Sequence, residues 1–211
     1  MVRGREGEKV YELVEIFESL QGEGRNMGRP CVFIRFAGCN LKCPWCDTDV
    51  KKRFSLSLED LLKEVKGFKA KSVILTGGEP TIQKDMPELV AALRREGYWV
   101  AVETNGTQDA VWLGFVDYVA CSPKMEFDDF YGSGKDSASP LKAADEVRVV
   151  ASSEKVVDFC KRIREQVAAT DYYVSPCDRD GKIDFATAKS VLAQLDGWSL
   201  SVQLHKILGF R

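Results

Sequence analysis

The stretch from Cys31 to Cys46 reads C-V-F-I-R-F-A-G-C-N-L-K-C-P-W-C, and it decides the fold more than any other part of the chain. Its first six residues are rich in β-branched and aromatic side chains, which predicts a buried β-strand. Three cysteines, Cys39, Cys43 and Cys46, follow in a loop at C-x3-C-x2-C spacing. The predicted strand therefore ends in a loop that holds three thiols.

The rest of the chain repeats this order of strand, polar loop and helix. A helix is expected from Ser57 to Gly67, because Ser57 and Asp60 form a capping-box pattern ahead of apolar residues at helical spacing. A final extended stretch is expected from Leu200 to Leu204. Further strands are expected at 72–75, 99–102, 118–120, 146–150 and 172–174, and further helices at 86–96, 110–115, 156–167 and 185–195.

Alternating strands and helices favour a parallel sheet with right-handed crossovers. Each strand–helix unit takes about 30 residues, so the 211 residues have room for about six units rather than the eight of a complete barrel. We expect an α/β fold, an open partial (βα)6 TIM-like barrel with a parallel sheet, in a single domain spanning 1–211. Residues 1–30 precede the first unit as an N-terminal leader, and the Asp-, Gly- and Ser-rich stretch 125–140 is expected to be a surface insertion.

Composition narrows the class of protein. Hydrophobic residues make up 45% and charged residues 29% of the chain, and the net charge is -2, which disfavours disorder and a basic nucleic-acid interface. Seven cysteines are an odd number, which disfavours a disulfide scaffold, and a single histidine disfavours a metal site built on imidazole. Neither a secretory signal nor an apolar run of about 20 residues is found, so we expect a cytoplasmic protein without membrane contact. In that compartment closely spaced cysteines more often bind metal or do redox chemistry.

Unusual residues follow successive predicted strands. In open parallel sheets the ligand site lies beyond the carboxyl ends of the strands. The segments in question are Gly38-Cys39, Thr76-Gly77-Gly78-Glu79-Pro80, Glu103-Thr104-Asn105-Gly106, Ser122-Pro123-Lys124 and Ser175-Pro176-Cys177-Asp178. The sequence therefore predicts one ligand site at one edge of the sheet.

Three thiolates from one short loop suit a cubane iron–sulfur cluster, because each binds one iron and leaves the fourth iron open. A zinc site is the alternative. It needs four ligands, and the fourth would come from a distant cysteine or from His205. A non-enzymatic iron–sulfur or zinc protein therefore remains open at this point.

The pair of motifs C-x3-C-x-W-C and T-G-G-E-P resembles the radical S-adenosylmethionine (SAM) superfamily. The resemblance implies that Cys39, Cys43 and Cys46 hold a [4Fe-4S] cluster and that SAM chelates the open iron. Electron transfer then cleaves the sulfonium to a 5'-deoxyadenosyl radical. Ordinary turn chemistry is the alternative for the glycines and the later loops. The SAM-binding residues implied are Trp45, Gly77, Gly78, Glu79, Glu103, Ser122, Pro123, Lys124, Ser175, Pro176, Cys177 and Asp178.

A narrower resemblance covers nearly the whole chain. The segments I-F-E-S-L-Q-G-E-G at 16–24, F-I-R at 33–35, C-D-T at 46–48 and L-H-K at 204–206 are similar to 7-carboxy-7-deazaguanine synthases. This resemblance implies a carbon–nitrogen lyase that converts 6-carboxy-5,6,7,8-tetrahydropterin to 7-carboxy-7-deazaguanine with loss of ammonia. The product feeds queuosine-type tRNA modification. A hydrogen atom would be taken from C6 of the pterin, and no acid–base pair is evident.

The same resemblance implies residue roles and partners. Thr48 would ligate Mg2+, and the N-terminal leader would contribute to substrate binding. A homodimer, and an electron donor such as flavodoxin or ferredoxin, are also implied, with no direct nucleic-acid partner. The substrate-binding residues implied are Leu20, Gln21, Gly22, Arg35, Thr76 and the chain terminus at Arg211.

Alternatives remain for these assignments. Gln21 and Glu23 could be solvated loop residues, Arg35 a member of an ordinary surface pair, and Thr48 part of an ST-turn. For His205 we favour a hydrogen-bonded histidine near the core. A glycyl-radical-enzyme activating protein shares the cysteine spacing and the compact partial barrel. Its substrate is a partner protein, which gives no reason for the L-Q-G-E-G segment.

Overall fold

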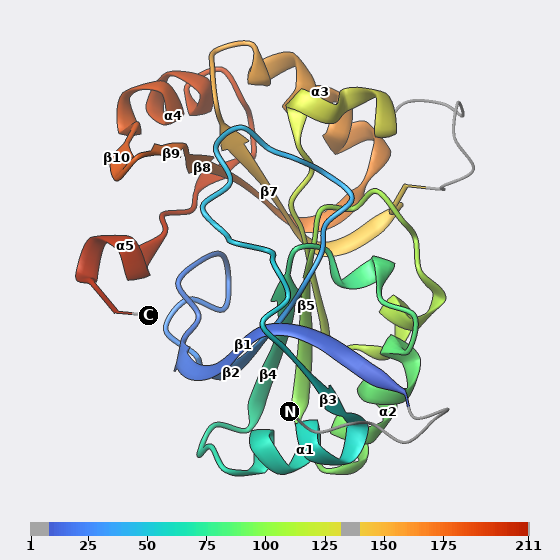
Figure 1. The fold of residues 1–211 in the computed structure, drawn as a ribbon. Coiled ribbons are helices and arrows are strands. Elements are labelled where there is room, and N and C mark those ends of the chain that lie inside the picture. Colours follow the sequence, from blue (N-terminus) through green and yellow to red (C-terminus); the bar gives the residue numbers. More distant parts are fainter. Residues whose placement is uncertain (1–8, 132–139, 211) are drawn as a thin grey trace.

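The computed structural model describes residues 9–131 and 140–210, and a mixed β-sheet runs through it (Figure 1). Residues 1–8 of the leader, residues 132–139 of the 125–140 insertion and Arg211 lie outside the described residues. The strands are β1 (Val10–Leu20), β2 (Pro30–Phe36), β3 (Phe54–Ser57), β4 (Ser72–Gly77), β5 (Trp99–Thr104), β6 (Tyr118–Cys121), β7 (Ala143–Ala151), β8 (Ala168–Pro176) and β11 (Ser199–Leu200). A separate small hairpin pairs β9 (Asp178–Arg179) with β10 (Lys182–Ile183).

Helices follow most of the parallel strands. The α-helices are α1 (Leu58–Lys66), α2 (Met86–Arg95), α3 (Val156–Gln166), α4 (Phe185–Leu192) and α5 (Leu204–Leu208). Three short 3-10 helices, η1 (Pro80–Ile82), η2 (Val111–Phe115) and η3 (Met125–Phe130), lie in the connections. Ser57 caps α1 as predicted, since its hydroxyl accepts from the Asp60 N–H at 3.2 Å.

The sheet order is β11-β8-β7-β6-β5-β4-β2-β1-β3. The strands β2, β4, β5, β6, β7 and β8 are consecutive neighbours and pair in parallel. These are the six predicted strands, and the order does not close on itself. The prediction of an open partial barrel with six parallel strands is therefore confirmed.

Strand β1 is a part of the sheet that the sequence analysis did not assign. It pairs antiparallel with β2 and with β3, and the rings of Phe17 and Phe33 stack across the first pair at 5.1 Å between centroids. The register shifts between Leu13 and Glu15, so the regular alternation that marks a strand is broken. Much of the expected leader is thus an integral strand of the sheet, between β2 and the edge strand β3.

The chain after α4 also differs from the prediction. The stretch Leu200–Leu204 was expected to be extended, but only Ser199 and Leu200 pair, in parallel with β8. Helix α5 begins at Leu204, and the helix predicted at 110–115 is the 3-10 helix η2. A two-residue strand is too short to show a hydrophobic period, which is why the sequence pattern predicted the segment from Leu200 to Leu204 poorly.

The two faces of the sheet differ in chemistry. One face packs against α1 to α4 in the main hydrophobic core, through residues such as Leu61, Leu89 and Phe159. The other face lines the inside of the partial barrel. Its deep layer is apolar, and the next inward-facing positions along the strands become polar, as from Ile74 to Thr76. This change places polar side chains at the carboxyl ends of the parallel strands. Among the described residues, no helix is long and apolar enough to cross a membrane.

Candidate functional site

Two adjoining cavities open at the carboxyl ends of the parallel strands. The first, of about 200 Å³, contains the three motif cysteines, and we call it the cysteine cavity. The second, of about 490 Å³, is lined by Leu20, Gln21, Gly22 and Arg35, and we call it the barrel cavity. The residues that line both cavities are Glu23, Asp47, Thr48, Thr76, Gly77, Glu103, Gln203 and Lys206. The two cavities are therefore parts of one site.

The cysteine loop lies along one wall of the cysteine cavity. Cys39, Cys43 and Cys46 all line it, and the Leu41 N–H points at the Cys39 sulfur at 3.4 Å. Burial raises the pKa of the Cys39 thiol, and it raises that of Cys43 to about 11. Across residues 9–131 and 140–210, no three His, Cys, Asp or Glu side chains converge on a single metal ion. A cubane cluster does not require such convergence, because each thiolate binds a different iron, so the donor set fits the cluster.

The Thr76–Pro80 loop packs its backbone directly against the cysteine loop. A Cβ on Gly78 would lie 1.7 Å from the Gly38 carbonyl oxygen, and one on Gly77 would lie 2.3 Å from the Phe36 carbonyl oxygen. Gly77 also has φ +129, a conformation that residues with a side chain rarely adopt. The Gly78 N–H donates to the Phe36 carbonyl at 3.1 Å. The two glycines are therefore required for the contact between the loops, independently of any ligand.

Nine of the twelve residues predicted to bind SAM line the cysteine cavity. They are Trp45, Gly77, Gly78, Glu103, Ser122, Lys124, Ser175, Pro176 and Asp178. Ser175 is buried, and its hydroxyl has no hydrogen-bond partner among the described residues. Buried polar groups are almost always paired, so this hydroxyl fits a bound polar ligand. The cavity walls therefore suit the cofactor that the motifs imply.

Glu79, Pro123 and Cys177, the other three residues predicted to bind SAM, line neither cavity. Glu79 is 0% exposed, and burial raises its pKa. Its carboxylate accepts from the backbone N–H groups of Thr81 at 3.0 Å and Asn105 at 2.6 Å. It also accepts from the hydroxyls of Thr81 and Thr104, both at 2.7 Å. The side chain thus holds two loops together behind the cavity wall. Pro123 and Cys177 are buried in the same way.

The barrel cavity brings together the described residues predicted to bind substrate. Leu20, Gln21, Gly22, Arg35 and Thr76 all line it, although their positions span three strands and a loop. The Arg35 Nε donates to the Glu15 carboxylate at 2.9 Å, which holds the guanidinium along the wall. Arg211, the sixth residue of this prediction, lies outside the described residues.

The prediction of His205 as a histidine near the core is wrong. It lies on α5, no residue of which is buried, and it lines the barrel cavity. Its ring packs against Gly22, where an added Cβ would lie 2.5 Å from its Nδ1 atom. The conformation of the last residues decides this placement, and no local sequence pattern carries it.

Helix α5, near the C-terminus, contacts loops at the mouth of both cavities. The Leu204 N–H donates to the Gly22 carbonyl at 3.0 Å, and Lys206 forms ion pairs with Asp47 and, at 2.8 Å, with Asp178. Thr48 lies beside Asp47, to which its hydroxyl donates at 3.2 Å. Burial alone would raise the pKa of Asp47, but the contacts with Lys206 lower it overall. Segments from both ends of the chain therefore meet at the cavity mouth.

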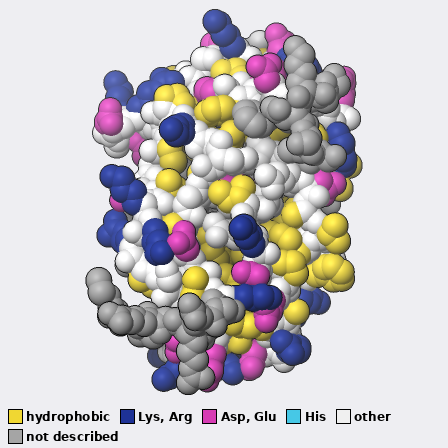
Figure 2. All heavy atoms as spheres, turned by 45° about the vertical axis from the view of Figure 1, so that its right-hand side comes forward, with side chains coloured by type: hydrophobic (Ala, Val, Ile, Leu, Met, Phe, Trp, Pro, Cys, Tyr) yellow, Lys and Arg dark blue, Asp and Glu magenta, His cyan; other side chains and the backbone are white. Residues whose placement is uncertain are grey.

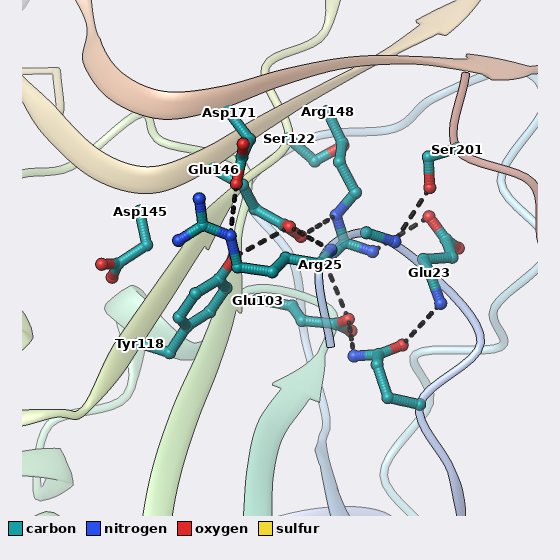
Figure 3. A network of polar contacts seen from close by, with 12 residues as sticks. Glu23, Arg25, Glu103, Tyr118, Ser122, Asp145, Glu146, Arg148, Asp171 and Ser201 are labelled. Atoms are coloured by element: carbon teal, nitrogen blue, oxygen red, sulfur yellow. Dashed lines mark hydrogen bonds and ion pairs between the residues drawn. The ribbon is translucent and has the colours of Figure 1, made fainter. Parts of the chain in front are cut away.

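A charge network inside the barrel was not predicted from the sequence (Figure 3). Arg148 on β7 forms ion pairs at 2.9 Å with each of Glu23, Glu103 and Glu146. Burial alone would raise the pKa of Glu103, but the charge of Arg148 and the hydrogen bonds that the carboxylate accepts lower it. A signal was present, since charged residues at 145, 146 and 148 interrupt a strand whose other residues are apolar, as those of buried parallel strands usually are.

Comparison with known proteins agrees with this geometry. Residues 33–174 match the family model described as the Radical SAM superfamily. The chain is 40% identical over 208 residues to the 7-carboxy-7-deazaguanine synthase of Haemophilus influenzae, covering 96% of this chain and 95% of that protein. It is 42% identical over 206 residues to the synthase of Neisseria meningitidis, covering 94% and 93%. The chain belongs to the 7-carboxy-7-deazaguanine synthase family.

A solved structure supports membership of this family. The crystal structure of QueE from Escherichia coli matches with a TM-score of 0.72 and 25% identity, over 93% of this chain and 95% of that one. Both resemblances stated from the motifs, to the radical SAM superfamily and to the 7-carboxy-7-deazaguanine synthase family, are therefore confirmed. The full-length match to synthases also replaces the glycyl-radical-enzyme activating protein and the non-enzymatic metal protein as explanations of the cysteine motif.

Proposed function

We propose that the two cavities act together to convert 6-carboxy-5,6,7,8-tetrahydropterin to 7-carboxy-7-deazaguanine, with loss of ammonia, in queuosine biosynthesis. The observation that carries this proposal is the shared wall, where Thr76, Gly77 and Glu103 face both the cysteine cavity and the barrel cavity. A radical enzyme needs its cofactor and its substrate within contact distance, and this wall provides that arrangement. Full-length relatives named 7-carboxy-7-deazaguanine synthase support the same activity.

The cysteine cavity is the proposed cofactor site. Cys39, Cys43 and Cys46 would hold the [4Fe-4S] cluster, and the nine lining residues named above would hold SAM. When bound, the cluster and SAM would supply the primary carbon radical that abstracts a hydrogen atom. The protein contributes an enclosing wall: Trp45 donates to Glu126 at 3.0 Å, and the Lys124 ammonium lies 5.3 Å from the centre of its ring. These contacts fix the Trp45 ring beside the cysteine loop.

The barrel cavity is the proposed substrate site. A pterin presents ring donors and acceptors along one edge, which the Gln21 amide and the backbone at Leu20 and Gly22 can pair with. Arg35 would add a charge-assisted contact to the substrate. The task of these groups is to orient the C6–H bond toward the cysteine cavity, which requires placement rather than acid–base chemistry.

Mg2+ is proposed at Thr48, which lies at the mouth of both cavities. Hard cations prefer oxygen ligands, and Mg2+ usually keeps few protein ligands and several waters. The Thr48 hydroxyl, with the Asp47 carboxylate beside it, offers such a site next to the substrate cavity. Replacing Thr48 with Ala is expected to raise the Mg2+ concentration needed for half-maximal turnover. An unchanged Mg2+ requirement would remove Thr48 from the site.

A homodimer and a flavodoxin- or ferredoxin-like electron donor complete the proposal. Sheet edges such as β3 and β11 are usually covered by another element or another chain. Sedimentation equilibrium of the cluster-loaded protein is expected to show two copies. A monomer at all concentrations tested would contradict the dimer.

Spectroscopy of the cluster tests the cofactor part of the proposal by itself. After anaerobic reconstitution with iron and sulfide, the electron paramagnetic resonance spectrum of the reduced protein is expected to change when SAM is added. A spectrum that never responds to SAM would contradict the radical mechanism. Turnover of the pterin, followed by mass spectrometry, then tests the substrate assignment separately.

A further inference from the structure

Arg148 lies at the centre of the buried network inside the barrel, and the proposed chemistry gives it no role (Figure 3). Its side chain is only 6% exposed, and it contacts three carboxylates, those of Glu23, Glu103 and Glu146, at 2.9 Å each. Glu146 and Arg148 lie two residues apart on β7, so both side chains face the barrel interior. One cation thus joins the loop after β1, strand β5 and strand β7.

Glu103 also accepts hydrogen bonds from two residues that line the barrel cavity. The Thr76 hydroxyl donates to one of its carboxylate oxygens at 2.8 Å, and the Gln21 amide donates to the other at 3.1 Å. The Gln21 amide oxygen in turn accepts from the Glu23 N–H at 3.0 Å. The orientation of both the Thr76 hydroxyl and the Gln21 amide is therefore set by Glu103.

The charge of Glu103 decides what these two residues offer to a ligand. An ionised carboxylate only accepts hydrogen bonds. Thr76 therefore directs its hydroxyl proton to Glu103 and keeps its oxygen lone pairs for the cavity. Gln21 directs one amide hydrogen to Glu103 and keeps the second as a donor. Protonation of Glu103 would turn one of its oxygens into a donor. The hydrogen bond with the Thr76 hydroxyl could then reverse, whereas the Gln21 NH2 cannot accept and its hydrogen bond would be lost unless the amide turned over.

We propose that Arg148 is a positioning residue of the barrel cavity. By holding Glu103 as an acceptor, it fixes the pattern of donors and acceptors that Thr76 and Gln21 present to the ring of the substrate. A buried carboxylate without a countercharge takes up a proton, so this pattern depends on the cation. The inference rests on the proposed function, because it concerns how the same cavity recognises the pterin through hydrogen bonds.

The Glu146 side of the network secures the loop that contains Gln21. Its carboxylate accepts from the Arg25 N–H and from the Tyr118 hydroxyl, both at 2.9 Å. A Cβ on Gly24 would lie 2.2 Å from the same carboxylate, so the loop lies directly on it. Arg148 therefore fixes the loop that contains Gln21 through two carboxylates, those of Glu146 and Glu103.

Three variants separate positioning from simple packing. Arg148→Met keeps much of the side-chain length and removes the charge, whereas Arg148→Lys keeps the charge. Arg162→Met is the matched control, since Arg162 also pairs with a carboxylate, that of Asp128, but on the exposed surface of α3. The KM for 6-carboxytetrahydropterin is measured for each cluster-loaded enzyme across a range of pH, and melting curves check that each variant is folded.

The proposal predicts a pH-dependent defect in Arg148→Met. Losing the cation raises the pKa of Glu103 toward neutrality, so the KM should rise about tenfold or more at the acid end and recover as pH increases. Arg148→Lys and Arg162→Met should follow the pH profile of the unmodified enzyme. The charged or titratable groups next to Glu103 are Arg148, Glu23, which pairs with the same guanidinium, and Cys31 on β2. Burial raises the pKa of Cys31 to about 12, so this thiol does not titrate in the pH range of the measurement.

A folded Arg148→Met enzyme with unchanged KM would overturn the proposal, as would a raised KM that neither varies with pH nor recovers in Arg148→Lys. If Arg148→Met does not fold, Glu103→Gln tests the same point with a side chain of the same shape. Its KM should stay raised at every pH, and an unmodified KM would overturn the proposal. If the unmodified enzyme responds to SAM but does not convert the pterin, the proposed function has failed instead.

Discussion

Glu79 is the residue on which the wall between the loops depends most. Its buried carboxylate accepts four hydrogen bonds, and two of these come from buried backbone N–H groups. Glu79→Ala would leave these donors unpaired. We expect a loss of about 3–5 kcal/mol of unfolding free energy and a melting temperature lower by about 10 °C.

The control for this substitution is Glu64→Ala, at an exposed glutamate on α1. It should change stability by less than about 0.5 kcal/mol. Equal melting temperatures for the two variants would show that the Glu79 hydrogen bonds do not stabilise the fold.

At the same scale, sequence reasoning found residues whose chemistry is local. The three cysteines share one loop, so their spacing alone predicts a common site. Arg148, Glu146 and Lys206 act across strands and across the two ends of the chain, and no spacing in the sequence brings them together. Glu79 belongs to a motif that was recognised, but the motif does not show that its side chain is buried among Thr81, Thr104 and Asn105, away from both cavities.

Between elements, the tightest contact is that of the Thr76–Pro80 loop with the cysteine loop. Gly78→Ala would place a Cβ 1.7 Å from the Gly38 carbonyl oxygen, and both sides of this contact are backbone. We expect a loss of about 1–3 kcal/mol of stability and reduced incorporation of the cluster, measured by its visible absorbance after reconstitution.

Gly114→Ala in η2 is the matched control, because nothing lies within 4 Å of the added Cβ. It should bind as much iron and sulfide as the unmodified chain. Normal cluster incorporation in Gly78→Ala would mean that the loops can separate without loss of the site.

The C-terminal segment is the second element contact that bears on function. Lys206 on α5 pairs with Asp47 after β2 and with Asp178 after β8, so it connects loops from distant strands of the sheet. Lys206→Met should raise the KM for SAM by about three- to tenfold. The difference should shrink at high salt, because these pairs are partly exposed and therefore screened.

Lys66→Met removes a comparable pair with Glu96 on the opposite side of the molecule and should leave the KM for SAM unchanged. A Lys206→Met enzyme with the same KM at low salt would show that the segment does not shape the site.

At the scale of the whole molecule, the chain length and the alternation of predicted strands and helices indicated a partial barrel with six parallel strands. These elements could be predicted because buried parallel strands and their helices each have a clear hydrophobic pattern. The strands outside this group of six were harder to predict. Strand β1 carries a bulge that breaks its alternation, and β11 has two residues, so neither shows the period of a strand. Yet the segments that follow these two strands bring Gln21, Gly22 and Lys206 to the cavity, and the substrate side of the site depends on them.

On the face shown in Figure 2, hydrophobic side chains gather in patches between charged ones. The most exposed large apolar residues of the described chain are Val111, Leu208 and Phe115. Of these, only Leu208 belongs to the segment that closes the site. Surface chemistry alone therefore does not indicate where the reaction takes place, whereas the interior of the barrel does.

Transfer of deuterium from substrate to cofactor tests most directly the claim that the two cavities form one site. Enzyme with its cluster, reductant and Mg2+ is incubated anaerobically with SAM and with pterin deuterated at C6. If the C6–H bond faces the cysteine cavity, deuterium accumulates in the recovered SAM while 7-carboxy-7-deazaguanine forms. Formation of this product with no deuterium in SAM or in its cleavage product would contradict the account.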